Sequence, residues 1–363
     1  MKIGIIGGGN LGSVLAVKFS QEHEVILYTN LIDKVHLYQS DMEVYCEDNN
    51  SYYRGKDIKY TTSIKELAKE SSYIFVTFPS FLFEELAKEL IPHLNKGHHL
   101  VFVPGSGGAE LFFKAALKKG ATITGLQRVH SVARITEFGK QVRESGVKSL
   151  LRIASIPNSY NEQARKDLEE LYHIKVEKLH NYLNVTFVNS NPILHTSRLY
   201  TIFKEYPDKK EYDSLPLFYE EWNDESSILL MEMDKELFDI FDVLEEHGLP
   251  IKEITPIAQY YDSETYSQLT NKLISIKAFK GIGTPSIKNS NGTYSPDLSS
   301  RYFTADFPFG LDILLAYGEF LKLHLPHMTQ VSNWYHKVSN TKKTFSLDQF
   351  GIQSIEDLVK IYK

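Results

Sequence analysis

The sequence predicts an α/β domain built around a parallel sheet, followed by an all-α domain. In the first half, short apolar and β-branched runs alternate with segments of helical periodicity. From about residue 181 the strand pattern stops, and apolar residues recur at helical spacing instead. A length of 363 residues fits two domains at about 150 residues or more each. We therefore expect one domain at 1–180 and a second at 181–363.

The first half alternates strands and helices, which is typical of a parallel sheet with helices on both faces. The expected strands are Lys2–Ile6, Glu24–Tyr28, Ile58–Thr61, Tyr73–Phe78, His99–Val103 and Thr122–Leu126. The expected helices between them are Leu11–Ser20, Ile64–Lys69, Phe81–Leu90 and Ala109–Lys119.

Two segments depart from this alternation. The polar stretch Ser40–Lys56 has apolar flanks that predict a small hairpin of Met42–Tyr45 with Tyr52–Tyr53. The runs Ser131–Thr136 and Val147–Ile153 are expected to be extra strands that finish the sheet, antiparallel to it.

The second half is expected to be helical, with a loop-rich stretch at Gly281–Phe309 that holds several glycines and prolines. Apolar residues at helical spacing predict the helices Asn181–Phe203, Ser226–His247, Ile251–Ser263, Ser267–Lys277, Leu311–Leu323 and Met328–Val338.

Composition excludes several classes of protein. With 40 Lys and Arg against 46 Asp and Glu, the formal net charge is −6, which argues against a nucleic-acid binder. The longest apolar run, Tyr73–Phe83, is too short for a membrane span and contains Pro79. A single cysteine, Cys46, allows no internal disulfide and favours a reducing compartment. We expect a cytoplasmic protein that acts on small molecules and forms a homodimer.

A glycine-rich turn follows the first expected strand and opens a helix. Gly7, Gly9 and Gly12 fit the G-x-G-x-x-G pattern of Rossmann-type dinucleotide-binding domains. The first glycine permits the tight turn, the second lets the backbone approach a pyrophosphate, and the third lets the helix pack close to the strand. Asn10 and Leu11 lie within the pattern, so they join the predicted cofactor site. A glycine-rich turn that binds nothing is the alternative.

The end of the second strand bears on the choice of dinucleotide. NAD-specific sites usually place Asp or Glu there, against the ribose hydroxyls. Here the strand is followed by Thr29 and Asn30, which could donate to a 2′-phosphate without repelling it. The sequence therefore favours NADP, with NAD or dual use left open.

Two further loops are expected at the carboxyl ends of strands, where ligands bind in open α/β sheets. Pro79 lies in the first loop, and Pro104 and Gly105 lie in the second. We expect these three residues to line the nicotinamide half of the site, although plain turn chemistry also explains them.

The helical half holds a set of polar residues suited to reducing a 2-keto acid. Such a reaction needs a guanidinium for the carboxylate, an acid/base that titrates near neutrality, and a carboxylate that orients it. Arg301, His195 and Asp306 supply these groups, and Asn191 lies four residues before His195. Taken alone, His195 also fits an ordinary buried histidine, and Arg301 with Asp306 fits a local salt bridge.

Five motifs resemble the opine dehydrogenase family, in order along nearly the whole chain: Gly7–Gly12, Pro104-Gly105 with Gly107-Gly108, Asn191-Pro192-x-x-His195, Phe218-Tyr219-Glu220 and Arg301-Tyr302-x-x-x-Asp306. The resemblance implies that His195 and Asp306 are a catalytic dyad and that Arg301 anchors a keto acid. It also implies that an amino acid condenses with a keto acid such as pyruvate, with Glu220 near the amine.

Two other functions stay open: a ketopantoate or glycerol-3-phosphate dehydrogenase type of reductase without an amine substrate, and a non-catalytic sensor of NAD(P). The histidines His93, His98 and His99 lack the spacing of metal ligands, so no metal is expected.

Overall fold

The computed structural model describes residues 1–363, which divide into two compact units. Residues 1–186 and 360–363 form the first unit, and residues 187–359 form the second. The division falls a few residues after the expected one, and the last four residues return to the first unit.

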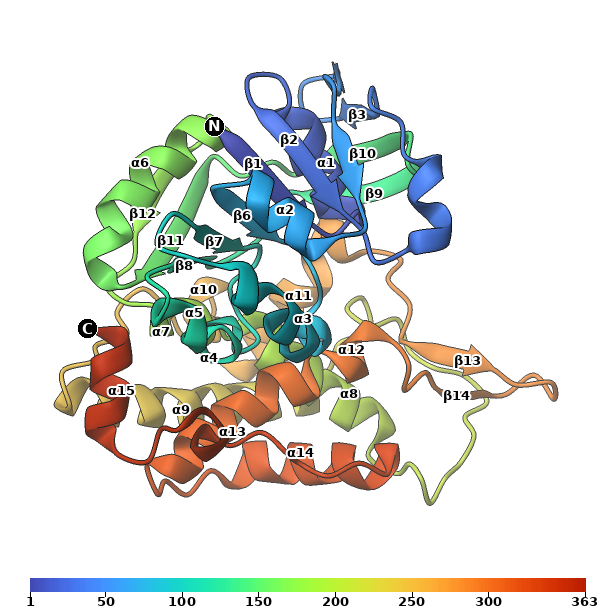
Figure 1. The fold of residues 1–363 in the computed structure, drawn as a ribbon. Helices are drawn as coiled ribbons and strands as arrows, with labels where there is room; N and C mark the ends of the chain where they lie inside the picture. Colours follow the sequence, from blue (N-terminus) through green and yellow to red (C-terminus); the bar gives the residue numbers. More distant parts are fainter. The chain divides into compact units, whose positions relative to one another are not determined.

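The first unit is built on an eight-stranded sheet with the order β12-β11-β8-β7-β6-β1-β2-β5 (Figure 1). The six strands from β8 to β5 in that order are parallel, and β11 joins β8 antiparallel. The strands are β1 (Lys2–Ile6), β2 (Glu24–Tyr28), β5 (Lys59–Thr61), β6 (Tyr73–Val76), β7 (His99–Phe102), β8 (Thr122–Leu126), β11 (Leu150–Ile156) and β12 (Lys175–Lys178).

The connections of this sheet run in opposite directions from β1, which pairs with β2 on one side and β6 on the other. In open α/β sheets, ligands bind at such a reversal, at the carboxyl ends of the strands. The central strands are buried on both faces, as in other parallel sheets. The helices of the unit are α1 (Asn10–Phe19), α2 (Ile64–Glu70), α3 (Phe83–Leu90), α4 (Ala109–Phe112), α5 (Lys114–Leu117), α6 (Asn161–Tyr172) and α7 (Leu183–Thr186).

A second, four-stranded sheet in the order β4-β3-β10-β9 packs against α1. The predicted hairpin is confirmed as β3 (Glu43–Cys46) and β4 (Ser51–Arg54), which pair antiparallel. The expectation that Ser131–Thr136 extends the main sheet is wrong, because β9 (Val132–Glu137) pairs with β10 (Gln141–Ser145) in this smaller sheet. Buried and exposed residues alternate in these strands, as suits a sheet covered on one face only.

The second unit is mainly helical, and α9 contacts α8, α11, α13 and α14 (Figure 1). Its elements are α8 (Thr196–Phe203), α9 (Asp224–Glu246), α10 (Ile257–Tyr260), α11 (Tyr266–Ser275), β13 (Ser286–Lys288), β14 (Tyr294–Pro296), α12 (Arg301–Thr304), α13 (Asp312–Phe320) and α14 (Pro326–Ser339). A last helix, α15 (Ile355–Tyr362), ends among the residues that return to the first unit. No helix combines the length and apolar character needed to cross a bilayer.

Two expected helices are shorter than predicted. The helix expected over Asn181–Phe203 is divided: α7 ends at Thr186, and a π-helical turn over Ser190–His195, which contains Pro192, leads into α8. The helix expected over Ile251–Ser263 is reduced to α10. Proline removes a backbone donor and disfavours helical geometry in the residue before it. Pro256 accordingly caps α10 instead of lying inside a longer helix.

Candidate active site

The glycine turn of the first unit connects β1 to α1. Gly7 has φ of +114°, a conformation that a side chain disfavours. A Cβ on Gly12 would overlap the carbonyl oxygen of Gly7, so the helix approaches the turn this closely only with glycine there. A Cβ on Gly9 would meet no neighbouring protein atom within 4 Å. Packing inside the protein therefore does not require glycine at Gly9, whereas close approach of a ligand to the backbone does.

The amino end of α1 begins at this turn, and no side chain caps it. Its first N–H groups and the positive end of the helix dipole favour an anionic group such as a pyrophosphate. The Asn10 side chain instead accepts a hydrogen bond from the backbone N–H of Ile135, at 2.9 Å. Leu11 packs against the apolar core of the unit. The turn and the helix end thus fit a dinucleotide, and Asn10 and Leu11 hold them in place.

The other predicted cofactor residues follow strand ends that lie level with one another. Strand β1 pairs Ile6 with Tyr28 and Val76, and Val76 pairs with Phe102. Thr29, Asn30, Pro79, Pro104 and Gly105 come directly after these strands, at the same edge of the sheet.

Their surroundings differ. Thr29 is buried and its hydroxyl accepts the N–H of Leu31 at 3.2 Å, whereas Asn30 is exposed. Gly105 packs on β8, where its N–H donates to Leu126 at 2.8 Å. The glycine at this position therefore serves packing within the sheet.

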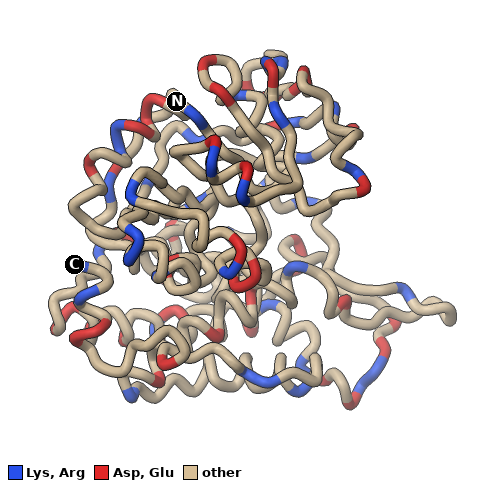
Figure 2. Tube along the Cα trace, viewed as in Figure 1, with Lys and Arg blue, Asp and Glu red and all other residues tan.

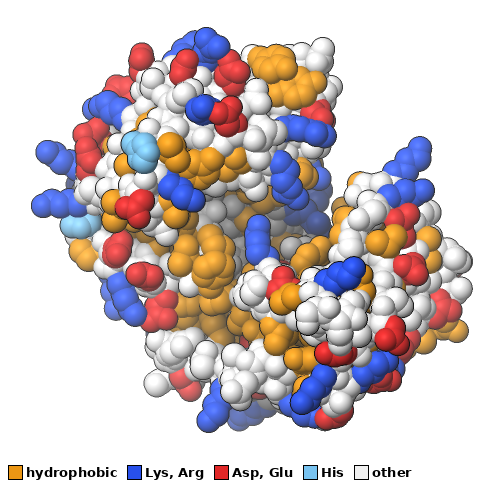
Figure 3. All heavy atoms as spheres, turned by 90° about the vertical axis from the view of Figure 1, so that its right-hand side faces the viewer, with side chains coloured by type: hydrophobic (Ala, Val, Ile, Leu, Met, Phe, Trp, Pro, Cys, Tyr) orange, Lys and Arg blue, Asp and Glu red, His pale blue; other side chains and the backbone are white.

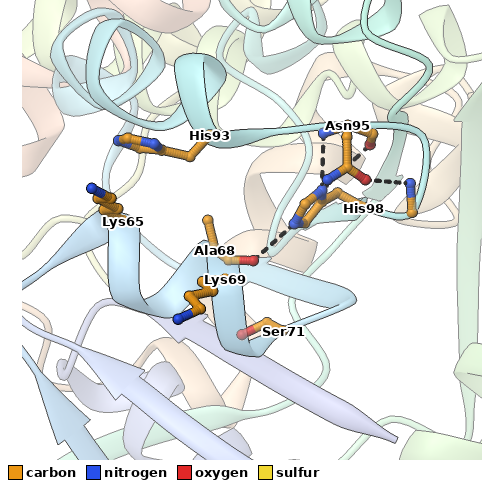
Figure 4. Close-up of a pocket in the computed structure, with 8 residues that line it drawn as sticks. Lys65, Ala68, Lys69, Ser71, His93, Asn95 and His98 are labelled. Carbon is orange, nitrogen blue, oxygen red and sulfur yellow. Dashed lines mark hydrogen bonds between the residues drawn. The ribbon is translucent and has the colours of Figure 1, made fainter.

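A separate hollow of about 480 Å³ lies near the amino ends of β6 and β7, lined by Lys65, Lys69, His93 and His98 among others (Figure 4). The Nε2 of His98 bonds the carbonyl oxygen of Ala68 at 2.8 Å, which turns that ring inward. This hollow is at the opposite edge of the sheet from the glycine turn. No three His, Cys, Asp or Glu side chains come together to hold a metal ion.

In the second unit, two π-helical turns pack against each other. They span Ser190–His195 and Phe307–Leu311, and each contains a proline that disrupts the regular helical hydrogen bonds. A Cβ on Gly310 would lie 3.1 Å from the Pro192 side chain, so the contact depends on glycine there. His195 ends the first turn and Asp306 directly precedes the second. The packing of the turns therefore brings these two side chains together.

His195 and Asp306 form a hydrogen-bonded pair. The distance from Nδ1 of His195 to a carboxylate oxygen of Asp306 is 2.8 Å. The side chains are 14% and 15% exposed, so the pair is sheltered but reachable. Because a carboxylate only accepts, Nδ1 carries the proton and Nε2 of the neutral ring is left as an acceptor. This is the arrangement of an acid/base histidine held by an acidic partner.

The hydroxyl of Tyr219 lies 2.8 Å from Nε2 of His195, a contact that the sequence analysis did not predict. Burial raises the pKa of Tyr219, so the phenol keeps its proton at working pH and donates a hydrogen bond to Nε2. Tyr302 is also close: the centroids of its ring and the His195 ring are 4.7 Å apart. Tyr219 stands in the motif Phe218-Tyr219-Glu220, from which the sequence analysis assigned a role to Glu220 alone.

The predicted substrate residues lie apart from these contacts. Arg301 begins α12, and its exposed guanidinium makes no hydrogen bond or ion pair within the protein. Asn191 is exposed in the first π-helical turn. A Glu220 oxygen accepts the N–H of Gly281 at 2.6 Å, so this carboxylate fixes a loop. Arg301 and Asn191 are thus free to meet a ligand, whereas Glu220 is already engaged.

Acidic and basic residues are interspersed along the chain (Figure 2), and both signs occur over the face drawn in Figure 3.

Comparison with known proteins gives two matches to protein families. Residues 178–339 match the alpha-helical domain of the NAD/NADP octopine/nopaline dehydrogenases. Residues 2–103 match the NADP oxidoreductases described as coenzyme F420-dependent.

Individual proteins are similar over nearly the whole chain. Tauropine dehydrogenase of Arabella iricolor is 26% identical over 360 residues, covering 92% of this chain and 90% of that protein. A structure of octopine dehydrogenase with NADH and L-arginine has a TM-score of 0.88 at 18% identity, covering 99% and 97% of the two chains. Octopine dehydrogenase with NADH and pyruvate has a TM-score of 0.84 at 18% identity, covering 99% and 98%. The sequence of this chain is thus similar to that of an opine-type dehydrogenase over nearly its whole length, and its fold is that of octopine dehydrogenase.

Proposed function

We propose that the protein catalyses the reductive condensation of a 2-keto acid with the amine of an amino acid. The observation that carries this proposal is the 2.8 Å hydrogen bond between His195 and Asp306. Pyruvate is the first keto acid to consider, because a similar structure holds pyruvate with NADH.

His195 accepts and donates the protons that are transferred in this reaction. When the substrate ammonium takes the place of the Tyr219 hydroxyl at Nε2, the neutral ring accepts its proton, and the freed amine attacks the keto carbon. It then returns that proton to the hydroxyl of the carbinolamine, so that water leaves and an iminium ion forms. Asp306 stabilises the imidazolium present between the two transfers. When bound, a dihydronicotinamide would supply the hydride, and the iminium ion would become a secondary amine.

Arg301 is the anchor for the keto-acid carboxylate. Its exposed guanidinium lacks an internal partner, so its donors are available for a bidentate pair. Asn191 is proposed to contact substrate from the same π-helical turn as His195. Glu220, which the resemblance puts near the amine, would first have to release the N–H of Gly281, because its carboxylate already accepts that hydrogen bond.

NADPH is the proposed cofactor, held by Gly7, Gly9, Gly12 and the adjoining strand ends. No carboxylate directly follows β2, where Thr29 and Asn30 stand instead. A dianionic 2′-phosphate is therefore not repelled at that place. Assembly as a homodimer and a cytoplasmic location stay predictions.

The test is oxidation of NADPH and of NADH, followed by absorbance, with pyruvate in the presence and absence of an amino-acid mixture. Oxidation that requires both pyruvate and amine is the expected result, and fractionating the mixture then identifies the amine. Oxidation with pyruvate alone would indicate a 2-keto acid reductase instead. Cofactor binding without oxidation across a wider set of keto acids and amines would contradict the proposal and favour an NAD(P) sensor.

A further inference from the structure

Arg198 is buried close to the dyad without a carboxylate partner. It lies on α8, three residues after His195, and is 1% exposed. Its Nε donates to the carbonyl of Phe218 at 2.9 Å, and its Nη2 donates to that of Glu221 at 2.6 Å. A longer contact of 3.4 Å reaches the carbonyl of Leu217.

Burial of this guanidinium is unfavourable in itself. Desolvation lowers the pKa of Arg198 to about 10, and its hydrogen-bond acceptors are uncharged. What the guanidinium provides is a rigid fork of donors for carbonyls that a tight turn cannot pair within itself. The bonded carbonyls belong to residues on both sides of Tyr219. Arg198 therefore fixes the backbone from which the Tyr219 side chain projects.

The Tyr219 ring is held on its faces as well. Phe279 stacks on it with centroids 4.1 Å apart and planes 19° apart. Trp222 lies nearly parallel at 6.2 Å, and the Arg198 guanidinium lies 5.3 Å from the Trp222 ring. With the ring and its backbone both fixed, the hydroxyl has a single position, which is 2.8 Å from Nε2 of His195.

We propose that Tyr219 and Arg198 are positioning residues for His195: Arg198 fixes the turn, and the Tyr219 hydroxyl holds the ring at Nε2 while Asp306 holds it at Nδ1. The inference rests on the proposed function, since it concerns the acid/base of that reaction. A histidine held at both nitrogens keeps one ring orientation and one tautomer before substrate arrives. When Nε2 gains a proton, the hydroxyl changes from donor to acceptor.

The first test needs no substrate. In protein with isotope-labelled histidine, the ring signals of His195 are identified by their loss in His195→Ala. Tyr219→Phe removes only the hydroxyl and is expected to shift the Nε2 signal. The matched control is Tyr212→Phe, which removes a buried hydroxyl of the same unit that has no partner. An Nε2 signal unchanged by Tyr219→Phe overturns the proposal.

The second test asks whether Arg198 acts through Tyr219. Each of Tyr219→Phe and Arg198→Lys is expected to lower kcat about tenfold, with little change in KM for the cofactor. In the Tyr219→Phe background, Arg198→Lys should add less than about a twofold loss, because residues in one chain of contacts are not additive. If Arg198→Lys lowers kcat by the same factor with and without Tyr219→Phe, Arg198 does not act through Tyr219, and its positioning role is contradicted.

Failure of this inference can be told from failure of the proposed function. If His195→Ala keeps normal turnover, the acid/base assignment is lost, whatever Tyr219 does. If His195→Ala abolishes turnover while Tyr219→Phe stays within twofold of the unsubstituted protein, only the positioning role is lost. Should Arg198→Lys not fold, Tyr219→Phe still decides the outcome.

Discussion

The glycine turn of the first unit and the dyad of the second unit are constructed by opposite means. The turn works through missing side chains within six consecutive residues, Gly7–Gly12. The dyad works through two side chains separated by 111 positions in the sequence. A site formed by backbone groups can be recognised from one local sequence pattern. A site made of side chains exists only once two distant turns pack together.

The largest expected effect is on the dyad. His195→Ala should lower kcat of the proposed condensation about a hundredfold or more, because His195 is its proposed proton donor and acceptor. Dinucleotide affinity, measured by fluorescence titration, should not change. His324→Ala, which removes an exposed histidine of the same unit, is the control. Near-normal turnover in His195→Ala would mean that His195 is not the acid/base of the reaction.

A buried carboxyl in the first unit should make stability depend on pH. Glu110 is fully buried, accepts hydrogen bonds from Thr186 at 2.6 Å and Tyr362 at 2.9 Å, and has no cationic partner. Desolvation raises its pKa to about 7. Between about pH 4.5 and 7 the carboxyl is ionised in the unfolded chain but protonated in the folded one, so stability falls as pH rises, by on the order of 3 kcal/mol in total.

Glu110→Gln should remove that loss. The free energy of unfolding in urea, measured at about pH 5 and about pH 8, should fall less in Glu110→Gln than in the unsubstituted protein. Glu89→Gln, an exposed change in the same unit, should leave the difference between the two pH values as it is. The same pH dependence in all three proteins would mean that Glu110 ionises normally.

Two glycines of the turn should respond differently to alanine. Gly12→Ala places a Cβ against the carbonyl of Gly7 and should lower the free energy of unfolding by about 1–3 kcal/mol. Gly9→Ala meets no protein atom, so stability should change by less than about 0.5 kcal/mol. Its dinucleotide affinity should nevertheless fall about tenfold, since the methyl group occupies the space for the pyrophosphate. Unchanged dinucleotide affinity in Gly9→Ala would mean that the turn is not part of the cofactor site.

The smallest expected effect concerns the choice of cofactor. Asn30→Asp places a carboxylate at the exposed end of β2 and should weaken NADPH relative to NADH about fivefold. Asn30→Ser, which adds no charge, is the control. The ratio of KM values for the two cofactors is the measurement. An unchanged ratio in Asn30→Asp would mean that Asn30 does not face the adenosine ribose.

The main features of the fold could be predicted from sequence because they follow from periodicity. Fully buried strands such as Tyr73–Val76 and an amphipathic helix such as α9 both show clear patterns. Strand β10 was missed because Val142 is its only apolar residue. Its buried Glu144 pairs with Lys18 at 2.5 Å, a partner that no local pattern reveals.

The candidate site was predicted in part. Chemistry and resemblance singled out His195 and Asp306, and the structure brings the two together. Tyr219 and Arg198 were missed because their roles depend on burial. A tyrosine between apolar neighbours and an arginine in a helix both look ordinary until their partners are known.

The return of residues 360–363 to the first unit bears on how the protein is made. The second unit is an insertion in the first, since residues 187–359 lie between its two segments. On the ribosome, the first unit can fold most of its sheet early, but it gains the Tyr362 bond to Glu110 only after the whole second unit has been synthesised. A fragment that stops at Thr186 would leave that buried carboxyl with one donor fewer, so joining the last four residues back to it should make the isolated first unit more stable.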